Sequence, residues 1–478
     1  MKFNFSDYTS DNIYLNNPQT GRSVSYNQIF ANAFKIANSQ EKYPKDSLIL
    51  ILVKDECLLL SSIIACWINK NIPAVYSPNL NESEYLYLQN KYLFSSVISE
   101  EKIIFKNIIN NIYKETFNPA LQIVKSNFEV EIEQIALVLF SSGTTGEPKA
   151  IPLSFINILS NINDFKKELN ISNINIFLCA SPIWHAHGLY NSFLTAFFLK
   201  TQVIYAGQLS IMNVNILFKT INAKKNIVFH ITPSMIPILL AISKKIPSCE
   251  LPCFYKLICG TSFLDKKSKL ELENIYKITL IQQYGMTETL FISVNHNYSK
   301  EKDLSVGVPL SNVKLEIWEN KILPKYEVGA IRLKSSSWYG NYYGENKYAN
   351  DDYFYTGDLG YLDKDNCLFI TGRIKDLIKK GGFSISATEI TNKVLEIKDI
   401  EDAYTMSIVD TNLGEEIYTF YVSNHEIPKQ NFITELSKSI SVKLLPKAFF
   451  KVDKILKTDT GKVSKPKMEK ILESILND

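Results

Sequence analysis

Charge of one sign and long apolar segments are both scarce in this sequence. Its 52 lysines and arginines stand against 49 acidic residues, a net charge of +3 over 478 residues. So small an excess gives no electrostatic basis for binding nucleic acid or an anionic membrane surface. The longest apolar stretches, at residues 48–53 and 58–67, are shorter than the roughly 20 residues that a membrane-spanning helix needs. No basic segment followed by an apolar core opens the chain, so we expect no signal peptide, no membrane span and a cytoplasmic location.

The cysteines follow neither a disulfide nor a metal-binding pattern. There are seven, an odd number, and most are set in apolar runs, which favours reduced and buried thiols. Cys249 and Cys253 have no second pair after them, which argues against a zinc site. With 46% apolar and 21% charged residues the chain has the composition of a globular protein, and its length predicts two or three domains.

What the sequence does contain is a regular alternation of strand and helix patterns. Residues 47–53 indicate a buried strand, 56–69 a helix, 72–76 the next strand and 81–92 the next helix. A similar unit recurs over residues 203–232. Repetition of this kind predicts parallel sheets covered by helices.

The second half of the chain changes character twice. From Val306 the strands shorten and turn residues multiply, which predicts an antiparallel subdomain. After Gly372 the pattern becomes that of a small α+β module. We therefore expect an α/β fold: a large N-terminal domain of two parallel α/β subdomains plus a small antiparallel β subdomain, followed by a small α+β C-terminal domain.

The strongest chemical signal is a polar, glycine-rich segment that directly follows a predicted buried strand. The segment reads Leu139-Phe140-Ser141-Ser142-Gly143-Thr144-Thr145-Gly146-Glu147-Pro148-Lys149. Glycines let a backbone aim its N–H groups at phosphates, while hydroxyls add donors and a lysine adds charge. The spacing is not that of the standard P-loop, and the nucleophile elbow of serine hydrolases is absent. Taken alone, the segment is also compatible with a flexible polar turn between a strand and a helix.

The segment resembles the phosphate-binding signature of the acyl-adenylate-forming superfamily, which comprises acyl- and aryl-CoA ligases, adenylation domains of peptide synthetases and luciferases. Further segments match this family in the right order over residues 25–468. The resemblance implies that the segment binds the phosphates of ATP and that Thr144 also contacts the metal. The implied phosphate-binding residues are Ser141, Ser142, Gly143, Thr144, Thr145, Gly146 and Lys149.

Two other segments resemble the nucleotide-binding motifs of the same family. In residues 282–289 the resemblance implies that Tyr284, with Gly285 beside it, stacks on adenine. Thr287 would bond the α-phosphate, and Glu288 would hold Mg²⁺, a hard cation that prefers oxygen ligands. Taken alone, this motif could also be a strand-to-helix turn with an N-cap threonine. The loop that runs along the adenine is matched by Gly260, Thr261 and Ser262.

Further along, the resemblance implies a ribose site and a domain boundary. Asp358 would accept hydrogen bonds from both ribose hydroxyls, and Arg373 would complete the ribose and phosphate contacts. Lys375 occupies the position of the hinge between the two domains of the family. The implied domains are therefore residues 1–374 and a mobile C-terminal domain at 375–478.

Lys462, in the run Lys457-Thr458-Asp459-Thr460-Gly461-Lys462, matches the catalytic lysine of the family. There it would bridge the substrate carboxylate and the α-phosphate. Because negative charge gathers on these oxygens in the transition state, a cation placed there stabilises the transition state more than the ground state.

The acyl pocket is indicated by a histidine motif. His185 falls on the motif position, and the run from His185 to Leu189 resembles CoA ligases that act on small dicarboxylates such as malonate or oxalate. No arginine that would suit a second carboxylate is found nearby. Residues 184–197 contain no acidic side chain, which argues against an amino acid substrate. A buried core histidine is the alternative interpretation.

The thiol acceptor is indicated by Gly381, Gly382 and Phe383, which resemble the CoA-facing turn of CoA ligases. The implied reaction converts a small carboxylic acid and ATP, with Mg²⁺, to an acyl-adenylate and pyrophosphate, and then passes the acyl group to CoA. A carrier-protein phosphopantetheine is the alternative acceptor. Because the chain ends soon after Lys462, an acyl or peptidyl carrier protein would have to come in trans. A catalytically retired nucleotide-binding or scaffold protein is the alternative from another class.

Overall fold

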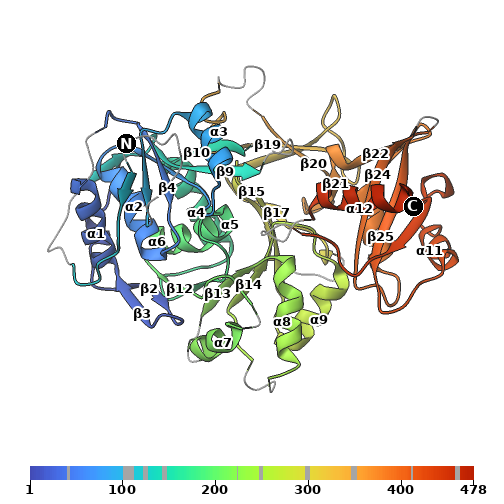
Figure 1. The fold of residues 1–478 in the computed structure, drawn as a ribbon, viewed down its shortest axis with the longest axis horizontal. Coiled ribbons are helices and arrows are strands. Elements are labelled where there is room, and N and C mark those ends of the chain that lie inside the picture. Colours follow the sequence, from blue (N-terminus) through green and yellow to red (C-terminus); the bar gives the residue numbers. More distant parts are fainter. Residues whose placement is uncertain are drawn as a thin grey trace.

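The computed structural model shows a large N-terminal body joined to a smaller C-terminal one (Figure 1). Two mainly parallel sheets and a four-stranded antiparallel sheet form the large body, and a mixed sheet forms the small one. The predicted fold class is confirmed. The structure describes residues 1–39, 43–100, 112–121, 128–142, 148–210, 212–222, 224, 226–246, 251–296, 302–345, 353–410, 413–457 and 463–477.

The first sheet has the strand order β10-β9-β5-β4-β6-β7. Its strands are β4 (Leu48–Leu52), β5 (Ile72–Val75), β6 (Ser96–Ser99), β7 (Ile112–Lys114), β9 (Ile135–Ser142) and β10 (Pro148–Ser154). Neighbouring strands are parallel except β9 and β10, which form an antiparallel hairpin. The crossovers after β4 and β5 are α2 (Glu56–Ile68) and α3 (Glu82–Tyr92), so the predicted strand–helix alternation is confirmed here.

The second sheet has the order β17-β16-β15-β14-β13-β11-β12-β2-β3, and its central strands are parallel. Its strands are β2 (Ile13–Asn17), β3 (Arg22–Ser25), β11 (Ile176–Cys179), β12 (Gln202–Tyr205), β13 (Ile227–Ile231), β14 (Lys256–Cys259), β15 (Leu280–Met286), β16 (Leu290–Asn295) and β17 (Val308–Pro309). Its first two strands come from the chain start, so the two parallel subdomains are interleaved in sequence. A separate short pair joins β1 (Lys2–Asn4) to β8 (Glu129–Glu131).

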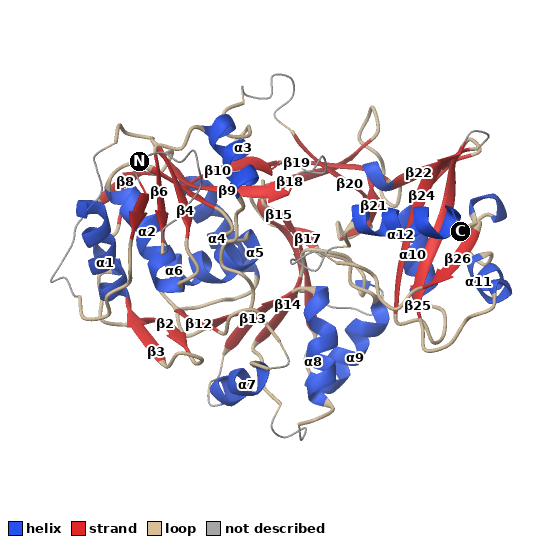
Figure 2. Ribbon diagram, viewed as in Figure 1, coloured by secondary structure: helices blue, strands red, loops and turns tan. Residues whose placement is uncertain are grey.

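Helices cover both faces of the second sheet (Figure 2). Those between the two sheets include α2, α4 (Phe155–Glu168) and α6 (Thr195–Phe198), with α1 (Tyr26–Ser39) and α5 (Ala186–Gly188) nearby. On the outer side lie α7 (Val214–Asn222), α8 (Ile236–Ser243) and α9 (Lys266–Tyr276). No helix in the described ranges combines the length and apolar character needed to cross a bilayer.

The antiparallel sheet consists of β18 (Val313–Trp318), β19 (Gly329–Ser335), β20 (Phe354–Leu362) and β21 (Leu368–Arg373). The C-terminal body contains β22 (Leu377–Lys380), β23 (Phe383–Ser386), β24 (Asp402–Asp410), β25 (Gly414–Val422), β26 (Ala448–Lys451), α10 (Ala387–Leu395), α11 (Lys429–Leu436) and α12 (Lys465–Asn477). The chain thus passes from one sheet to the next between Arg373 and Leu377. The boundary at residues 374 and 375 stays a prediction that this change of sheet supports.

The core between the two parallel sheets is aromatic. Helix α2 is buried along almost its whole length, which explains why its sequence is apolar on all sides. Its Trp67 stacks on Phe5, with ring centroids 5.5 Å apart, and meets Phe155 edge-on at 5.0 Å. The Trp67 indole N–H donates to the Ala136 carbonyl at 2.6 Å, so its one polar group is satisfied. This packing fixes strand β9, which leads into the glycine-rich segment.

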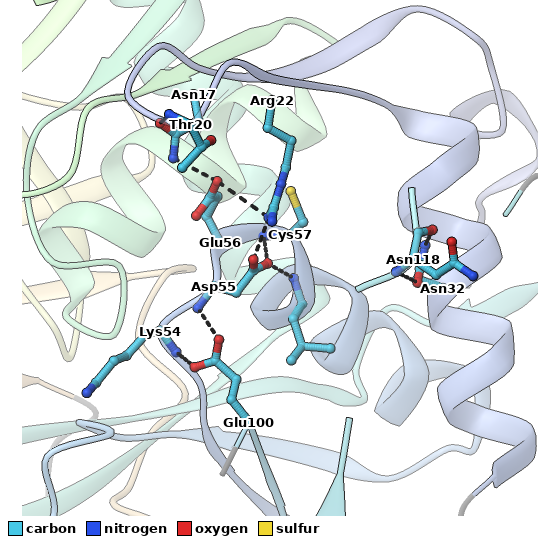
Figure 3. A network of polar contacts seen from close by, with 11 residues as sticks. Asn17, Thr20, Arg22, Asn32, Lys54, Asp55, Glu56, Cys57, Glu100 and Asn118 are labelled. Atoms are coloured by element: carbon cyan, nitrogen blue, oxygen red, sulfur yellow. Dashed lines mark hydrogen bonds and ion pairs between the residues drawn. The ribbon is translucent and has the colours of Figure 1, made fainter. Parts of the chain in front are cut away.

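A polar network fastens the edge of the second sheet to the first (Figure 3). Arg22, on β3, pairs with Asp55, whose other carboxylate oxygen accepts from two backbone N–H groups at the start of α2. Glu56 accepts from the Asn17 side chain at 2.9 Å, and Glu100 accepts from the backbone N–H of Asp55 at 3.0 Å. None of these residues belongs to a predicted motif, and we assign the network a structural role.

A buried ion pair positions strand β15, which carries Tyr284. Lys269, on α9, is fully buried and pairs with Asp303, and its Nζ also donates to the Asp303 carbonyl at 2.8 Å. The same carbonyl accepts from the Gln282 side chain at 2.7 Å. The ion pair therefore links α9, β15 and the segment that leads into β17.

Lys269→Met should lower the free energy of unfolding by about 3 kcal/mol, because it leaves the Asp303 carboxylate buried with a weaker partner. Lys266, 3.7 Å from Asp303, compensates only in part. Chemical denaturation measures the loss, with Lys267→Met, an exposed lysine on the same helix, as the control. Equal stability of the two variants would show that the buried pair contributes nothing net.

Candidate active site

The glycine-rich segment joins two strands of a hairpin. Ser141, at the end of β9, is paired in register with Lys149 on β10, and Ser142 with Pro148. The structure places a second strand after the segment, where the alternative interpretation placed a helix. The remaining predicted phosphate ligands, Gly143, Thr144, Thr145 and Gly146, lie outside the described residues. Because the hairpin pairs the two flanks of the segment, Ser141 and Lys149 stand side by side at the end of the hairpin where the segment connects its strands.

Lys149 and Glu288 are connected through a tyrosine that no motif predicted. The Lys149 ammonium lies over the ring of Tyr342, 4.6 Å from its centroid. The Tyr342 hydroxyl lies 3.4 Å from Glu288 Oε1, at the long end of the hydrogen-bond range. Glu288 is buried, in the turn between β15 and β16, with Thr287 beside it. This turn leads into a strand, so the alternative of a strand-to-helix turn does not hold.

Asp358 is the centre of a second group. It lies on β20 directly opposite Arg373 on β21, and Arg373 Nε donates to Asp358 Oδ1 at 2.8 Å. The Tyr284 hydroxyl, from β15, donates to Asp358 Oδ2 at 2.6 Å. The Asp358 backbone N–H donates to Thr356 Oγ1 at 3.1 Å. Three of the predicted nucleotide-binding residues are therefore in direct contact, although they come from two different sheets.

The electrostatics of this group follow from its burial. Burial raises the pKa of Tyr284 well above its usual value, and the charge of Asp358 raises it further, so the tyrosine stays a hydrogen-bond donor. Burial by itself would lower the pKa of Arg373, but the charge of and hydrogen bond to Asp358 outweigh it and raise the pKa. A carboxylate offers about four lone-pair positions, and these two partners take one on each oxygen. Asp358 therefore keeps acceptor capacity on both oxygens.

The loop that matches the family's adenine-binding segment has an unusual backbone. Thr261 has a φ of +79°, a region that β-branched residues rarely adopt. Strain of this kind tends to persist at functional sites. Gly260 precedes it, and a Cβ at Gly260 would lie 3.0 Å from the carbonyl oxygen of Gln283, next to Tyr284. Thr261 and Ser262 are both exposed, and Gly285 leaves no room for a side chain against the Leu290 carbonyl.

The histidine motif lies at the end of β11. His185 precedes the short helix α5, and the next turns form a π-helix at Leu189–Leu194, a feature that is frequent at functional sites. His187 Nδ1 is 2.9 Å from Ser181 Oγ. Its ring meets that of His230 on β13 at right angles, 6.4 Å between centroids. Burial lowers the pKa of His187 to about 4, although a hydrogen bond to the Ile231 backbone opposes the shift.

Acid should destabilise the protein partly through His187. Because its folded-state pKa of about 4 lies below the ordinary 6.5, the unfolded chain takes up the proton first, so stability is lost as the pH falls from about 6.5 to about 4. Between pH 7 and 4.5, His187→Asn should lose about 2 kcal/mol less stability than the wild type. Urea unfolding at both pH values measures this. Parallel losses in the two proteins would contradict a His187 that is neutral in the folded protein.

Those predicted C-terminal residues that the structure describes lie in the small body or at its entrance. Lys375 is in the short 3₁₀ helix Ile374–Asp376 between the two bodies. Gly381 and Gly382 form the turn between β22 and β23, with φ values of +57° and +83°, and Phe383 is 45% exposed beside it. Two positive φ angles are what a two-residue hairpin turn of type I′ requires. Lys462 lies outside the described residues.

Tyr342 and His230 were not predicted from the sequence. Each contacts a residue of a predicted motif only through the tertiary fold, and neither belongs to a spacing that marks chemistry by itself. His230 is 2% exposed, and its Nε2 is buried without a hydrogen-bond partner among the described residues. The presence of two tyrosines after Gly340 was the only sequence signal for Tyr342.

The donor set fits a magnesium ion that is shared with a nucleotide. No cluster of three or more metal-ligating side chains occurs within the described ranges of the chain. Glu288 thus offers a single buried carboxylate, with Lys149 linked to it through Tyr342. This suits Mg²⁺, which usually takes one or two carboxylates and completes its shell with water and substrate phosphates.

Comparison with known proteins agrees with this geometry. Residues 6–343 match the AMP-binding enzyme family. The 2-succinylbenzoate–CoA ligase of Staphylococcus epidermidis is 26% identical over 94% of this chain and 93% of its own, and the malonate–CoA ligase of Arabidopsis thaliana is 24% identical over 95% and 85%. The o-succinylbenzoate coenzyme A synthetase MenE of Bacillus subtilis, solved with ATP and magnesium, has the same fold, with a TM-score of 0.82 at 19% identity over 98% of this chain and 100% of MenE.

These matches confirm the predicted enzyme class, an AMP-forming acid–thiol ligase. They also confirm the resemblance that the glycine-rich segment first indicated. The match spans both parallel sheets and reaches Tyr343, so it includes the hairpin, the β15–β16 turn and the histidine motif. The chain therefore belongs to the AMP-binding enzyme family.

Proposed function

We propose that this enzyme activates a small carboxylic acid with Mg·ATP, releases pyrophosphate and transfers the acyl group from the adenylate to the thiol of CoA. The observation that carries the proposal is the direct contact of Asp358 with Tyr284 and Arg373. A second contact, through Tyr342, links Lys149 to Glu288. Together these groups supply a ribose acceptor, a phosphate cation and a carboxylate for Mg²⁺.

In the first half-reaction, the protein contributes position and charge. A carboxylate oxygen of the acid attacks the α-phosphorus, and the bond to the pyrophosphate oxygen breaks. Asp358 would hold the ribose hydroxyls, while Lys149 and the segment around it would bind the leaving phosphates. Glu288 would hold Mg²⁺, which neutralises phosphate charge when it is bound. Thr287 would donate to the α-phosphate, and Lys462 would approach the same group from the small body.

In the second half-reaction, a thiol attacks the acyl carbon, and AMP leaves. We propose that residues 375–478 rotate about Lys375, so that Lys462 withdraws and the Gly381–Gly382 turn faces the thiol. The exposed Phe383 beside that turn supports contact with the pantetheine arm. CoA is the proposed acceptor because the relatives compared above are named CoA ligases.

The described side chains around the histidine motif, which would border the acid, are uncharged. His187 is neutral at physiological pH, and the segment of residues 184–197 contributes no acidic side chain. An α-amino group would thus find no carboxylate partner there. We propose a small non-amino acid. The acids named in the relatives, 2-succinylbenzoate and malonate, are the first to test, and each would need a cation for its second carboxylate from outside residues 184–197.

Carboxylate-dependent ATP–pyrophosphate exchange tests this proposal. The panel contains 2-succinylbenzoate, malonate, oxalate, benzoate, octanoate and several amino acids, each with Mg²⁺. Exchange with one class and thioester formation with CoA would support it. Exchange followed by transfer only to a phosphopantetheinylated carrier protein would reassign the acceptor. Absence of ATP binding in folded protein would overturn the proposed function and favour a retired site.

A further inference from the structure

Tyr342 contacts both charged groups that the proposed function assigns to Mg·ATP, and it has no role in that proposal. Its ring face meets the Lys149 ammonium at 4.6 Å, and its hydroxyl meets Glu288 at 3.4 Å. The tyrosine is 9% exposed. A cation and a carboxylate from different sheets thus meet on one nearly buried side chain.

The position of Tyr342 is fixed by its neighbours on both sides. The backbone N–H of Tyr343 donates to the Ala150 carbonyl at 2.9 Å, which ties this segment to the residue after Lys149. On the other side, Trp338 meets the Tyr342 ring edge-on, 6.0 Å between centroids. Gly340, with a φ of +104°, allows the chain to turn between these two contacts. The backbone next to Tyr342 is therefore attached to β10, the strand that carries Lys149.

We infer that Tyr342 is a positioning residue that holds Lys149 and Glu288 apart and aimed at Mg·ATP. Opposite charges in a nearly buried site attract strongly. A direct ion pair between Lys149 and Glu288 would leave neither group available when the nucleotide binds. A phenol can contact both groups and keep them from pairing with each other, because its ring face attracts a cation while its hydroxyl donates to a carboxylate. The contact of the Lys149 ammonium with the ring face and the long hydrogen bond to Glu288 are both weak, so Mg²⁺ or a phosphate can replace them. The inference rests on the proposed function.

The two halves of the contact can be separated by substitution. Tyr342→Phe removes the hydroxyl at Glu288 but keeps the ring face for Lys149. It should raise the Mg²⁺ concentration for half-maximal ATP binding about 3- to 10-fold, with ATP affinity at saturating Mg²⁺ within about twofold of the wild type. Tyr342→Leu removes both contacts and should in addition lower the ATP affinity at saturating Mg²⁺ about 5- to 20-fold.

Calorimetric titration of ATP at several Mg²⁺ concentrations measures both quantities, and it needs no knowledge of the acid. Tyr343→Phe is the matched control, because it removes a neighbouring hydroxyl and keeps the backbone bond to Ala150. It should behave as the wild type does. Melting temperatures establish that each variant is folded. The Phe variant preserves the buried ring, so it remains informative if the Leu variant unfolds.

Two outcomes would overturn the inference: wild-type Mg²⁺ dependence in Tyr342→Phe, or equal losses of ATP affinity at saturating Mg²⁺ in the Phe and Leu variants. A double-mutant cycle of Lys149→Met with Tyr342→Leu adds a second test, since additive losses would show that the two residues act independently. Failure of the wild-type protein to bind ATP would instead overturn the proposed function. The two failures are therefore distinguishable.

Discussion

Lys462→Ala is expected to lower the rate of carboxylate-dependent ATP–pyrophosphate exchange at least about 100-fold, the loss typical of removing one preorganised charge or donor from a transition state. The attacking carboxylate and the α-phosphate both carry negative charge, and that charge concentrates between them as the new bond forms. A lysine ammonium placed there is worth more in the transition state than in the ground state. The effect should therefore fall on kcat, with little change in ATP affinity.

The described residues on either side of Lys462 include one, Lys465, that lies near the hinge residue Lys375. Lys457 and Val463 pair with each other across the undescribed residues, and α12 begins two residues later at Lys465. Burial lowers the pKa of Lys375, and the positive charges of Arg373 and Lys465 add to the shift. Lys465 is thus close enough to the hinge residue Lys375 for its charge to act there.

Lys454→Ala is the matched control for Lys462, because Lys454 is an exposed lysine shortly before the same segment. It should retain the full exchange rate. Thermal melting of both variants shows whether either loses its fold. Near-normal exchange in folded Lys462→Ala would remove the catalytic assignment, whatever the effect on thioester formation.

Asp358→Ala should raise the KM for ATP by about 10- to 100-fold and change kcat less. The carboxylate would hold two ribose hydroxyls, and a hydrogen bond to a charged acceptor contributes about 1.5–3 kcal/mol net, so the expected change corresponds to the net loss of about one such bond. The substitution also leaves Arg373, which is 41% exposed, without its partner. Because solvent screens such a group, we expect only a modest loss of folding stability.

Asp358→Asn separates charge from shape. It keeps an oxygen for Tyr284 or the ribose but loses the charge that holds Arg373, so its KM should lie between those of the wild type and the alanine variant. Asp365→Asn, at an exposed aspartate paired with Lys302, is the control and should leave ATP affinity unchanged. ATP titration checks all three variants. An unchanged affinity in Asp358→Ala would exclude the ribose role.

Much of the fold was predictable because its parallel strands are buried on both faces. The apolar strand at Leu48–Leu52, the helix at Glu56–Ile68 and the strand at Ile72–Val75 were each predicted within one or two residues. The crossing of β2 and β3 into the second sheet was not. Strand order depends on which apolar faces meet, and local periodicity carries no information about that.

The chemistry-bearing residues were predictable to the extent that they are adjacent in sequence. Ser141 to Lys149 lie within one hairpin, and Tyr284 to Glu288 lie within one strand and its turn, so their order along the chain is enough to mark them. The residues that contact them in the folded protein were not indicated by the sequence. Tyr284 and Asp358 are 74 residues apart, and Tyr342 and Glu288 are 54 apart.

By itself, the sequence determined the class of protein, an α/β enzyme of the AMP-binding family, because the motifs that identify the family are written in short runs of residues. Only the tertiary structure decided that Arg373 and Tyr284 share Asp358, and that Tyr342 stands between Lys149 and Glu288. The physical reason is that these contacts depend on strand register and on the approach of one sheet to another. Both are set by packing over the whole domain, where the burial of apolar surface outweighs any local preference.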